Sequence, residues 1–251
     1  MPKLLCLGFG YSARALVRTL EGWEIAGTTR EQKLTAEARA GATHILMSIP
    51  PDDEGGPVED CAGAEWIGYL STTGVYGNRD GAWVDETAGL RPSGARGARR
   101  VLAEERWRGQ GAHIFRLAGI YGPGRSPFDA LRAGTARRFD RPGQVFSRIH
   151  VDDLATVLRA SIEKPRPGAT YNACDDEPAA PADVIAHAAG LLGIAPPPLE
   201  PFDPASLSPM AQSFWADNKR VSNALIKREL GVALRYPDYR AGLAGILAAG
   251  G

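Results

Sequence analysis

A short apolar run near the N-terminus leads directly into a glycine-rich turn. Residues 4–7 read Leu-Leu-Cys-Leu, as in a buried strand, and Gly8-x-Gly10-x-x-Ala13 follows at once. Gly8 permits a tight turn, Gly10 lets the backbone approach a pyrophosphate, and the small Ala13 lets the next helix pack closely on a sheet. Apolar spacing predicts that helix over residues 12–20, with its first amides facing the phosphates. The pattern therefore favours a dinucleotide site over the alternative, a turn that binds nothing.

The second strand-like run, residues 24–27, continues into Thr28-Thr29-Arg30. At this place an NAD site usually carries an acid that holds the ribose 2′-hydroxyl, whereas an arginine accommodates the 2′-phosphate of NADP. The next acid, Glu31, lies beyond the expected strand end. We therefore expect NADP in preference to NAD, with Arg30 at the 2′-phosphate. The alternative for Arg30 is a solvated cation at the start of a helix.

The composition excludes several classes of partner. The 251 residues are 44% hydrophobic and 23% charged, enough to build one domain or a large domain with a smaller lobe. Lys plus Arg equal Asp plus Glu at 29 each, so we expect neither nucleic acid nor a membrane as partner. The sequence contains no signal-like segment and no long apolar run, which favours a cytoplasmic protein. The cysteines at 6, 61 and 174 are far apart, so neither disulfides nor a metal site is expected.

Strand-like and helical segments alternate along the chain, which is typical of an α/β fold with a doubly wound parallel sheet. Segments 31–43 and 52–65 are short for the usual connections, and they leave open whether a strand has been lost. The expected strands are 4–7, 24–27, 44–48, 66–71, 113–117 and 170–174, and the expected helices are 12–20, 95–108, 151–163, 181–192, 222–230 and 239–247.

Four further segments carry a resemblance to a known family. In chain order they are Tyr69-Leu-Ser-Thr-Thr-Gly-Val-Tyr-Gly77, Phe115-Arg-Leu-Ala-Gly-Ile-Tyr-Gly-Pro-Gly124, Phe146-Ser-Arg-Ile-His-Val-Asp-Asp-Leu154 and Tyr171-Asn-Ala-Cys-Asp-Asp-Glu-Pro178. Together they resemble the extended short-chain dehydrogenases/reductases, the NAD(P)-dependent epimerase/dehydratase family, over nearly the whole chain. The resemblance implies a Rossmann sheet with a small C-terminal substrate lobe, and it implies a homodimer, since helices of this family often pair.

We expect the dinucleotide-binding domain to comprise residues 1–122 with 147–175, and the substrate lobe to comprise 123–146 with 176–251. The aromatic and methionine side chains at 210, 214 and 215 are expected to pack inside that lobe rather than to contact a cofactor.

The resemblance also places the residues of the reaction. In that family a Ser or Thr four residues before the tyrosine of the Val-Tyr-Gly segment bonds the reacting oxygen, which here is Thr72, four before Tyr76. A Tyr-x-x-x-Lys pair on a helix then transfers the proton, but this chain has Arg96 and Arg100 at the two positions. A guanidinium stays protonated and cannot act as an acid or base near neutrality. The chain therefore resembles an atypical member that lacks the pair.

Three interpretations of Arg96 and Arg100 remain open. They could bind an anionic substrate or the cofactor, because the guanidinium fork matches carboxylate and phosphate. They could stabilise a developing oxyanion while Tyr76 or Tyr121 donates the proton. They could also form a solvated basic face that pairs with Glu104 and its acidic neighbour on the same helix.

The sequence thus predicts an NADP-dependent oxidoreductase or epimerase/dehydratase that acts on a polar small molecule. The alternatives are a catalytically silent NADP(H)-binding sensor or regulatory protein and, with no cofactor at all, a scaffold. The expected catalytic residues are Thr72, Tyr76, Arg96 and Arg100, with no metal, and the expected cofactor-binding residues are Gly8, Phe9, Gly10, Tyr11, Ser12, Thr29, Arg30, Ser48, Ile49, Ser71, Leu117 and Gly119.

Overall fold

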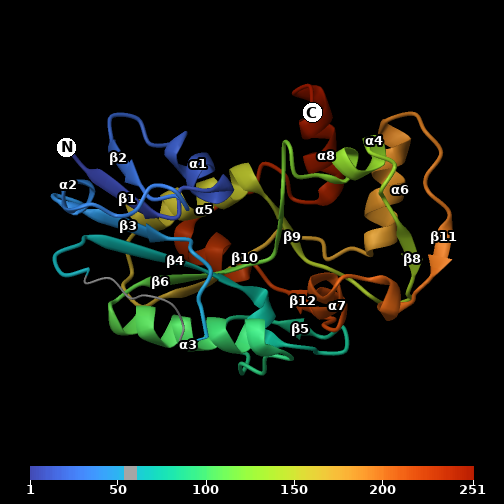
Figure 1. The fold of residues 1–251 in the computed structure, drawn as a ribbon, viewed down its shortest axis with the longest axis horizontal. Coiled ribbons are helices and arrows are strands. Elements are labelled where there is room, and N and C mark those ends of the chain that lie inside the picture. Colours follow the sequence, from blue (N-terminus) through green and yellow to red (C-terminus); the bar gives the residue numbers. More distant parts are fainter. Residues whose placement is uncertain (54–60) are drawn as a thin grey trace.

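The main sheet has six strands, all parallel, in the order β10-β6-β4-β3-β1-β2 (Figure 1). The computed structural model describes residues 1–53 and 61–251. The expected α/β fold with a doubly wound parallel sheet is confirmed, and each expected strand lies within a residue or so of its predicted bounds. The strands are β1 (Lys3–Leu7), β2 (Glu24–Gly27), β3 (His44–Met47), β4 (Trp66–Thr72), β6 (His113–Leu117) and β10 (Thr170–Ala173).

Helices cover both faces of this sheet because successive strand residues point to opposite sides. In β1, Leu4 and Cys6 join the core beneath α1 (Tyr11–Val17) and α5 (Val151–Glu163). The alternate residues Leu5 and Leu7 join a second core with Ala103 and Trp107 of α3 (Ala95–Gly109). A strand that is buried on both faces has a continuous apolar sequence, which is why these strands could be predicted so well.

The sheet ends at β2. Only the single-turn helix α2 (Ala36–Arg39) lies between β2 and β3, whereas the commonest doubly wound order places a further strand outside the second one. The question left open by segment 31–43 is therefore answered: this segment contains no strand. The other short segment, 52–65, falls partly on residues 54–60, which lie outside the described residues.

A smaller body lies beyond the carboxyl end of the sheet, on the right in Figure 1. It is built from α4 (Pro127–Arg132), α6 (Pro181–Leu191) and α8 (Tyr239–Ala248), whose apolar faces share a third core. The expected domain boundaries stay a prediction. The segment around η3 (Ile226–Leu230) belongs to the core of the main sheet, where Ile226, Leu230 and Val232 pack.

Three pairs of short strands were not expected from the sequence. They are β5 (Trp83–Val84) with β12 (Arg220–Val221), β7 (Gly119–Tyr121) with β9 (Arg148–His150), and β8 (Arg138–Asp140) with β11 (Leu199–Pro201).

Among the helices, α5 matches its predicted bounds, whereas the expected helix over 12–20 ends at Val17 and the one over 222–230 is largely the π-helical η3. The remaining short helices are η1 (Thr73–Tyr76), η2 (Pro204–Ser206) and α7 (Pro209–Trp215). Within the part of the chain that the structure describes, no helix has both the length and the apolar character that a membrane crossing requires.

Candidate functional site

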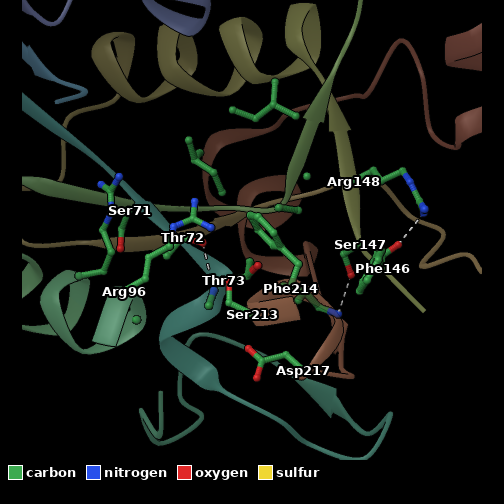
Figure 2. A pocket seen from close by; sticks show the side chains of 18 of the residues that line it. Ser71, Thr72, Thr73, Arg96, Phe146, Ser147, Arg148, Ser213, Phe214 and Asp217 are labelled. Carbon is green, nitrogen blue, oxygen red and sulfur yellow. Dashed lines mark hydrogen bonds between the residues drawn. The ribbon is translucent and has the colours of Figure 1, made fainter. Parts of the chain in front are cut away.

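A cavity of about 860 Å³ opens at the carboxyl ends of the strands. Five parts of the chain form most of its wall: residues 10–12 after β1, 71–74 at the end of β4, 117–121 from the end of β6 through β7, 93–97 at the start of α3, and the end of α7 with the loop that follows it, within 211–219. Figure 2 shows part of this wall. Ligands of doubly wound sheets bind at this edge, so the cavity is the candidate site.

The glycine-rich turn has the geometry that the sequence predicts. Gly8 has φ +95°, and a Cβ there would lie 2.6 Å from the Oγ atom of Ser48, so a side chain does not fit. Ser48 Oγ donates to the Gly8 carbonyl at 2.5 Å, and the Gly8 amide donates to Thr28 Oγ1 at 3.0 Å. Gly10, by contrast, has open space where a side chain would project, and α1 begins after it without a side-chain cap or an acidic residue in its first turn. These free amides form a place for an anion.

At the end of β2, Gly27 allows a close approach of Phe9, since a Cβ would lie 2.9 Å from the Phe9 Cβ. Thr29 Oγ1 accepts from the amides of Glu31 and Gln32, and Arg30 is exposed. Ile49, also exposed, follows β3. These positions lie at the strand ends but outside the cavity wall.

The cavity brings together ten of the sixteen expected site residues: Gly10, Tyr11, Ser12, Ser48, Ser71, Thr72, Arg96, Arg100, Leu117 and Gly119. Gly8, Phe9, Thr29, Arg30, Ile49 and Tyr76 are not among its lining residues.

The end of β4 presents two neighbouring hydroxyls that have opposite hydrogen-bonding roles. Ser71 Oγ lies 2.6 Å from Glu104 Oε1 and must donate to it, because a carboxylate only accepts. Ser71 can then only accept a hydrogen bond from a ligand. Thr72 Oγ1 accepts from the Gly74 amide at 3.1 Å as the N-cap of η1 (Figure 2), which leaves its hydroxyl proton free to donate. Thr72 can therefore serve as a donor to a substrate oxygen.

A buried polar network lies behind these hydroxyls. Arg116 donates from Nε and Nη2 to the two carboxylate oxygens of Glu104, at 3.1 and 2.8 Å, and from Nη1 to the Tyr76 hydroxyl at 2.9 Å. Tyr76 in turn donates to Asn172 Oδ1 at 2.7 Å. Burial raises the pKa of Tyr76 to about 12, and its side chain is fully buried. Its hydroxyl is committed inside the protein, so we do not place Tyr76 among the residues that touch a substrate.

The two arginines at the Tyr-x-x-x-Lys positions differ in their surroundings. Arg100 Nη1 donates to the Leu70 carbonyl at 2.6 Å and to the Tyr69 hydroxyl at 3.1 Å, which ties its guanidinium to β4. The Arg96 guanidinium lies 4.6 Å from the centre of the Phe214 ring, and the two side chains extend toward one another (Figure 2). Partial burial and the charge of Arg100 lower the pKa of Arg96, which as an arginine still remains charged at neutral pH.

The part of the third interpretation that pairs Arg96 and Arg100 with Glu104 is wrong, and the part that concerns its neighbour Glu105 stays a prediction. The Glu104 carboxylate is held by Arg116 at 2.8 Å, with Arg108 of the same helix at 3.7 Å. The sequence does contain one sign of a buried ion pair. Arg116 stands within the mostly apolar strand β6, and a buried arginine needs an acidic partner.

The cavity wall also carries residues that sequence reasoning missed. Lys219 donates to Asp217 Oδ2 at 2.9 Å, and both side chains are largely buried. Burial lowers the pKa of Lys219. Arg125 also lines the cavity, with its guanidinium 5.9 Å from the centre of the Tyr11 ring. These residues belong to connections without a readable motif, so no pattern in the sequence could have placed them.

Two expectations for this wall need comment. Tyr121, considered as a proton donor, lines the cavity, but its hydroxyl donates to the Asp238 carbonyl at 3.3 Å and burial raises its pKa. The expectation that residues 210, 214 and 215 pack inside the lobe is wrong for Met210 and Phe214, which are 68% and 48% exposed. Within the described residues, no three His, Cys, Asp or Glu side chains gather in a way that could hold a metal ion.

Comparisons with known proteins connect this geometry to relatives. No protein-family model matches the chain. Protein YeeZ of Escherichia coli strain K12 is 28% identical, over 95% of this chain and 97% of its own. A solved structure of a functionally unknown conserved protein from Silicibacter pomeroyi is 50% identical, with a TM-score of 0.93 and 99% of both chains covered.

Two more distant structures carry descriptive names. The human epimerase family protein SDR39U1, solved with NADPH, has a TM-score of 0.80 at 15% identity and covers 99% of both chains. UDP-glucuronic acid 4-epimerase from Bacillus cereus, solved in complex with NAD, has a TM-score of 0.76 at 13% identity and covers 96% of both. At these identities the likeness shows the fold. The chain has the fold of the NAD(P)-dependent epimerase/dehydratase proteins, and the resemblance expected from the sequence is confirmed at that level.

Proposed function

We propose that this chain of epimerase/dehydratase fold is an NADP(H)-dependent oxidoreductase or epimerase/dehydratase that acts on a polar small molecule. One observation carries the proposal: a single cavity joins the free amides at the start of α1 to the Thr72 hydroxyl. A dinucleotide needs the first feature for its pyrophosphate, and a carbonyl or alcohol substrate needs the second at its reacting oxygen.

The residues present fit a nicotinamide dinucleotide. Gly10 leaves room for a phosphate against the backbone, and Ser48 holds the turn in place through the Gly8 carbonyl. A bound nicotinamide would supply or accept a hydride. The choice of NADP rests on Arg30, which is exposed at the end of β2 where NAD sites carry an acid.

The remaining roles in the reaction fall to three side chains of the cavity. Thr72 donates a hydrogen bond that orients the substrate oxygen, and the Arg96 guanidinium adds a positive charge to the wall of the same cavity. Neither can take up a proton near neutrality. Lys219 is the lysine of the cavity wall; burial lowers its pKa and Asp217 holds it in place, so we propose it as the proton donor.

Calorimetric titration with NADPH and NADH tests the cofactor assignment. Wild-type protein should bind NADPH more tightly, and Arg30→Ala should weaken NADPH about 10-fold while leaving NADH nearly unchanged, since a charge-assisted contact of about 1.5–3 kcal/mol is lost. The matched control is Lys33→Ala, which removes another exposed cation three residues away. An unchanged ratio of the two affinities in Arg30→Ala would contradict the assignment.

Turnover distinguishes the enzyme from the other classes. Turnover of a panel of carbonyl and sugar-nucleotide substrates should be lost in Thr72→Val, which keeps the shape but removes the hydroxyl. Net NADPH oxidation reports a reductase, and chromatography of the products reports an epimerase or dehydratase, whose cofactor is regenerated in each cycle. Tight NADPH binding with no turnover in any sample would instead support a sensor, an alternative suggested by the arginines at 96 and 100. Absence of binding to either dinucleotide would reject both.

A further inference from the structure

We propose that Arg96 anchors an oxyanion of the substrate, so that the molecule turned over here carries a carboxylate or phosphate group close to its reacting carbon. The inference rests on the function proposed above and names the substrate class of the same cavity. It also selects one of the three interpretations that the sequence left open for Arg96.

The charge of the cavity wall is the first observation. Within the described residues, the wall contains five cationic side chains and one carboxylate, Asp217, which Lys219 neutralises. Arg100 is committed to β4, and Arg148 donates to the carbonyls of Phe146 and Ala179. The cations of the wall are Arg96, Arg100, Arg125, Arg148 and Lys219.

The setting of Arg96 is the second observation. The central carbon of its guanidinium lies over the Phe214 ring, 4.6 Å from the ring centre, and Arg100 is a like charge one helical turn away. Stacking on an aromatic ring holds the plane of a guanidinium and leaves the N–H groups along its edge free. A fork of this kind matches the paired oxygens of a carboxylate or a phosphate. Arg96 is thus oriented for an anion, and no acidic side chain among the residues of the wall neutralises it.

The position of Arg96 assigns the anion to the substrate rather than to the cofactor. The start of α3 packs on η1, where a Cβ at Gly97 would lie 2.9 Å from the Gly74 carbonyl oxygen. Arg96 therefore projects from the helix turn that lies against the segment carrying Thr72. The cation beside the nucleotide turn is a different one, Arg125, which lies over the Tyr11 ring. An oxyanion on Arg96 would sit near the oxygen that Thr72 orients.

Inorganic phosphate and sodium acetate are suitable probes, because each offers the oxyanion without the rest of a substrate. Each is titrated calorimetrically into free and NADPH-loaded protein. Arg96→Gln should weaken both probes about 10- to 100-fold, as expected for loss of charge-assisted hydrogen bonds, and Arg96→Lys should fall between, since it keeps the charge but not the fork. The matched control is Arg99→Gln, whose arginine pairs with Asp53 at 2.6 Å outside the cavity wall and whose probe affinities should stay within about 2-fold.

The outcomes separate this inference from the function on which it rests. Equal probe affinities in Arg96→Gln and Arg99→Gln, or no probe binding to wild-type protein at tens of millimolar, would overturn it. A comparable loss of NADPH affinity in Arg96→Gln would also overturn it, because the arginine would then contact the cofactor. Failure of wild-type protein to bind NADPH would reject the proposed function, while titration of the free protein would still decide the role of Arg96. Thermal melting of each variant confirms that it is folded.

Discussion

Replacing Glu104 by glutamine should destabilise the protein severely although the two side chains have nearly the same shape. Glu104 is fully buried and accepts from three donor groups: Nε and Nη2 of Arg116, at 3.1 and 2.8 Å in their shortest contacts, and Ser71 Oγ at 2.6 Å. Glutamine keeps one acceptor oxygen, but its amide group would face donors. The substitution leaves the Arg116 charge buried without its counter-ion. Removing one member of a buried ion pair destabilises a protein more than replacing both members by apolar residues.

The expected cost follows from these contacts. Two hydrogen bonds to a charged group are lost, at about 1.5–3 kcal/mol each, which agrees with the roughly 3–5 kcal/mol typical of removing one member of a buried ion pair. For a chain of 251 residues, 1 kcal/mol shifts the melting temperature by about 2–4 °C, so Glu104→Gln should melt roughly 6–20 °C lower.

Urea unfolding and thermal melting measure the effect, with Glu105→Gln, an exposed acid one position along α3, as the control. The double variant Glu104→Met with Arg116→Met should lose less stability than Glu104→Gln, because it leaves no buried charge unpaired. A loss below about 1 kcal/mol in Glu104→Gln, or a double variant that is less stable than the single one, would refute the reasoning.

Two further predictions concern the backbone and the pH dependence of stability. Gly77 has φ +67°, and a Cβ there would overlap the Arg91 carbonyl oxygen. Gly77→Ala should therefore lower the urea midpoint well below that of the control Gly124→Ala, because Gly124 has a similar φ of +70° but open surroundings. Equal midpoints of the two variants would contradict this. Burial raises the pKa of Asp175 to about 8, above its value in the unfolded chain. The free energy of unfolding therefore falls as the pH rises from about 4 to about 8, because the unfolded chain ionises this carboxyl more easily than the folded protein does. Asp175→Asn should therefore gain stability relative to wild type across that interval, and a difference in unfolding free energy that is the same at both ends would show that the carboxyl does not titrate as inferred.

The sequence was sufficient where structure depends on neighbours along the chain. The strands of the main sheet are apolar runs buried on both faces, and α5 begins with acids at its positive end, so its predicted bounds of 151–163 agree with the structure. It was insufficient where residues far apart must meet. The pairing of β5 with β12 joins residues 83–84 to 220–221, and no local pattern in either segment indicates the other.

The candidate site shows the same division. The turn after β1 could be predicted because each glycine has a local reason, whether a positive φ at Gly8 or open space at Gly10. The surroundings of Arg96 could not be predicted, because Phe214 reaches it from a different part of the chain. The segment that contains Phe214 also has the apolar sequence of a packed core segment. Nor could Glu104 be recognised as the partner of Arg116, since the pairing depends on how α3 lies against β6.

The route of the chain between its two bodies has a consequence for any attempt to dissect it. The backbone leaves the body that contains the main sheet after β7, returns to its core at β9, leaves again after β10, returns near η3 and ends in α8. A single proteolytic nick therefore cannot release either body as one complete fragment. Expression of the sheet without the smaller body would require joining separate stretches by artificial linkers, because every continuous fragment that contains all six strands also contains α4 of the smaller body.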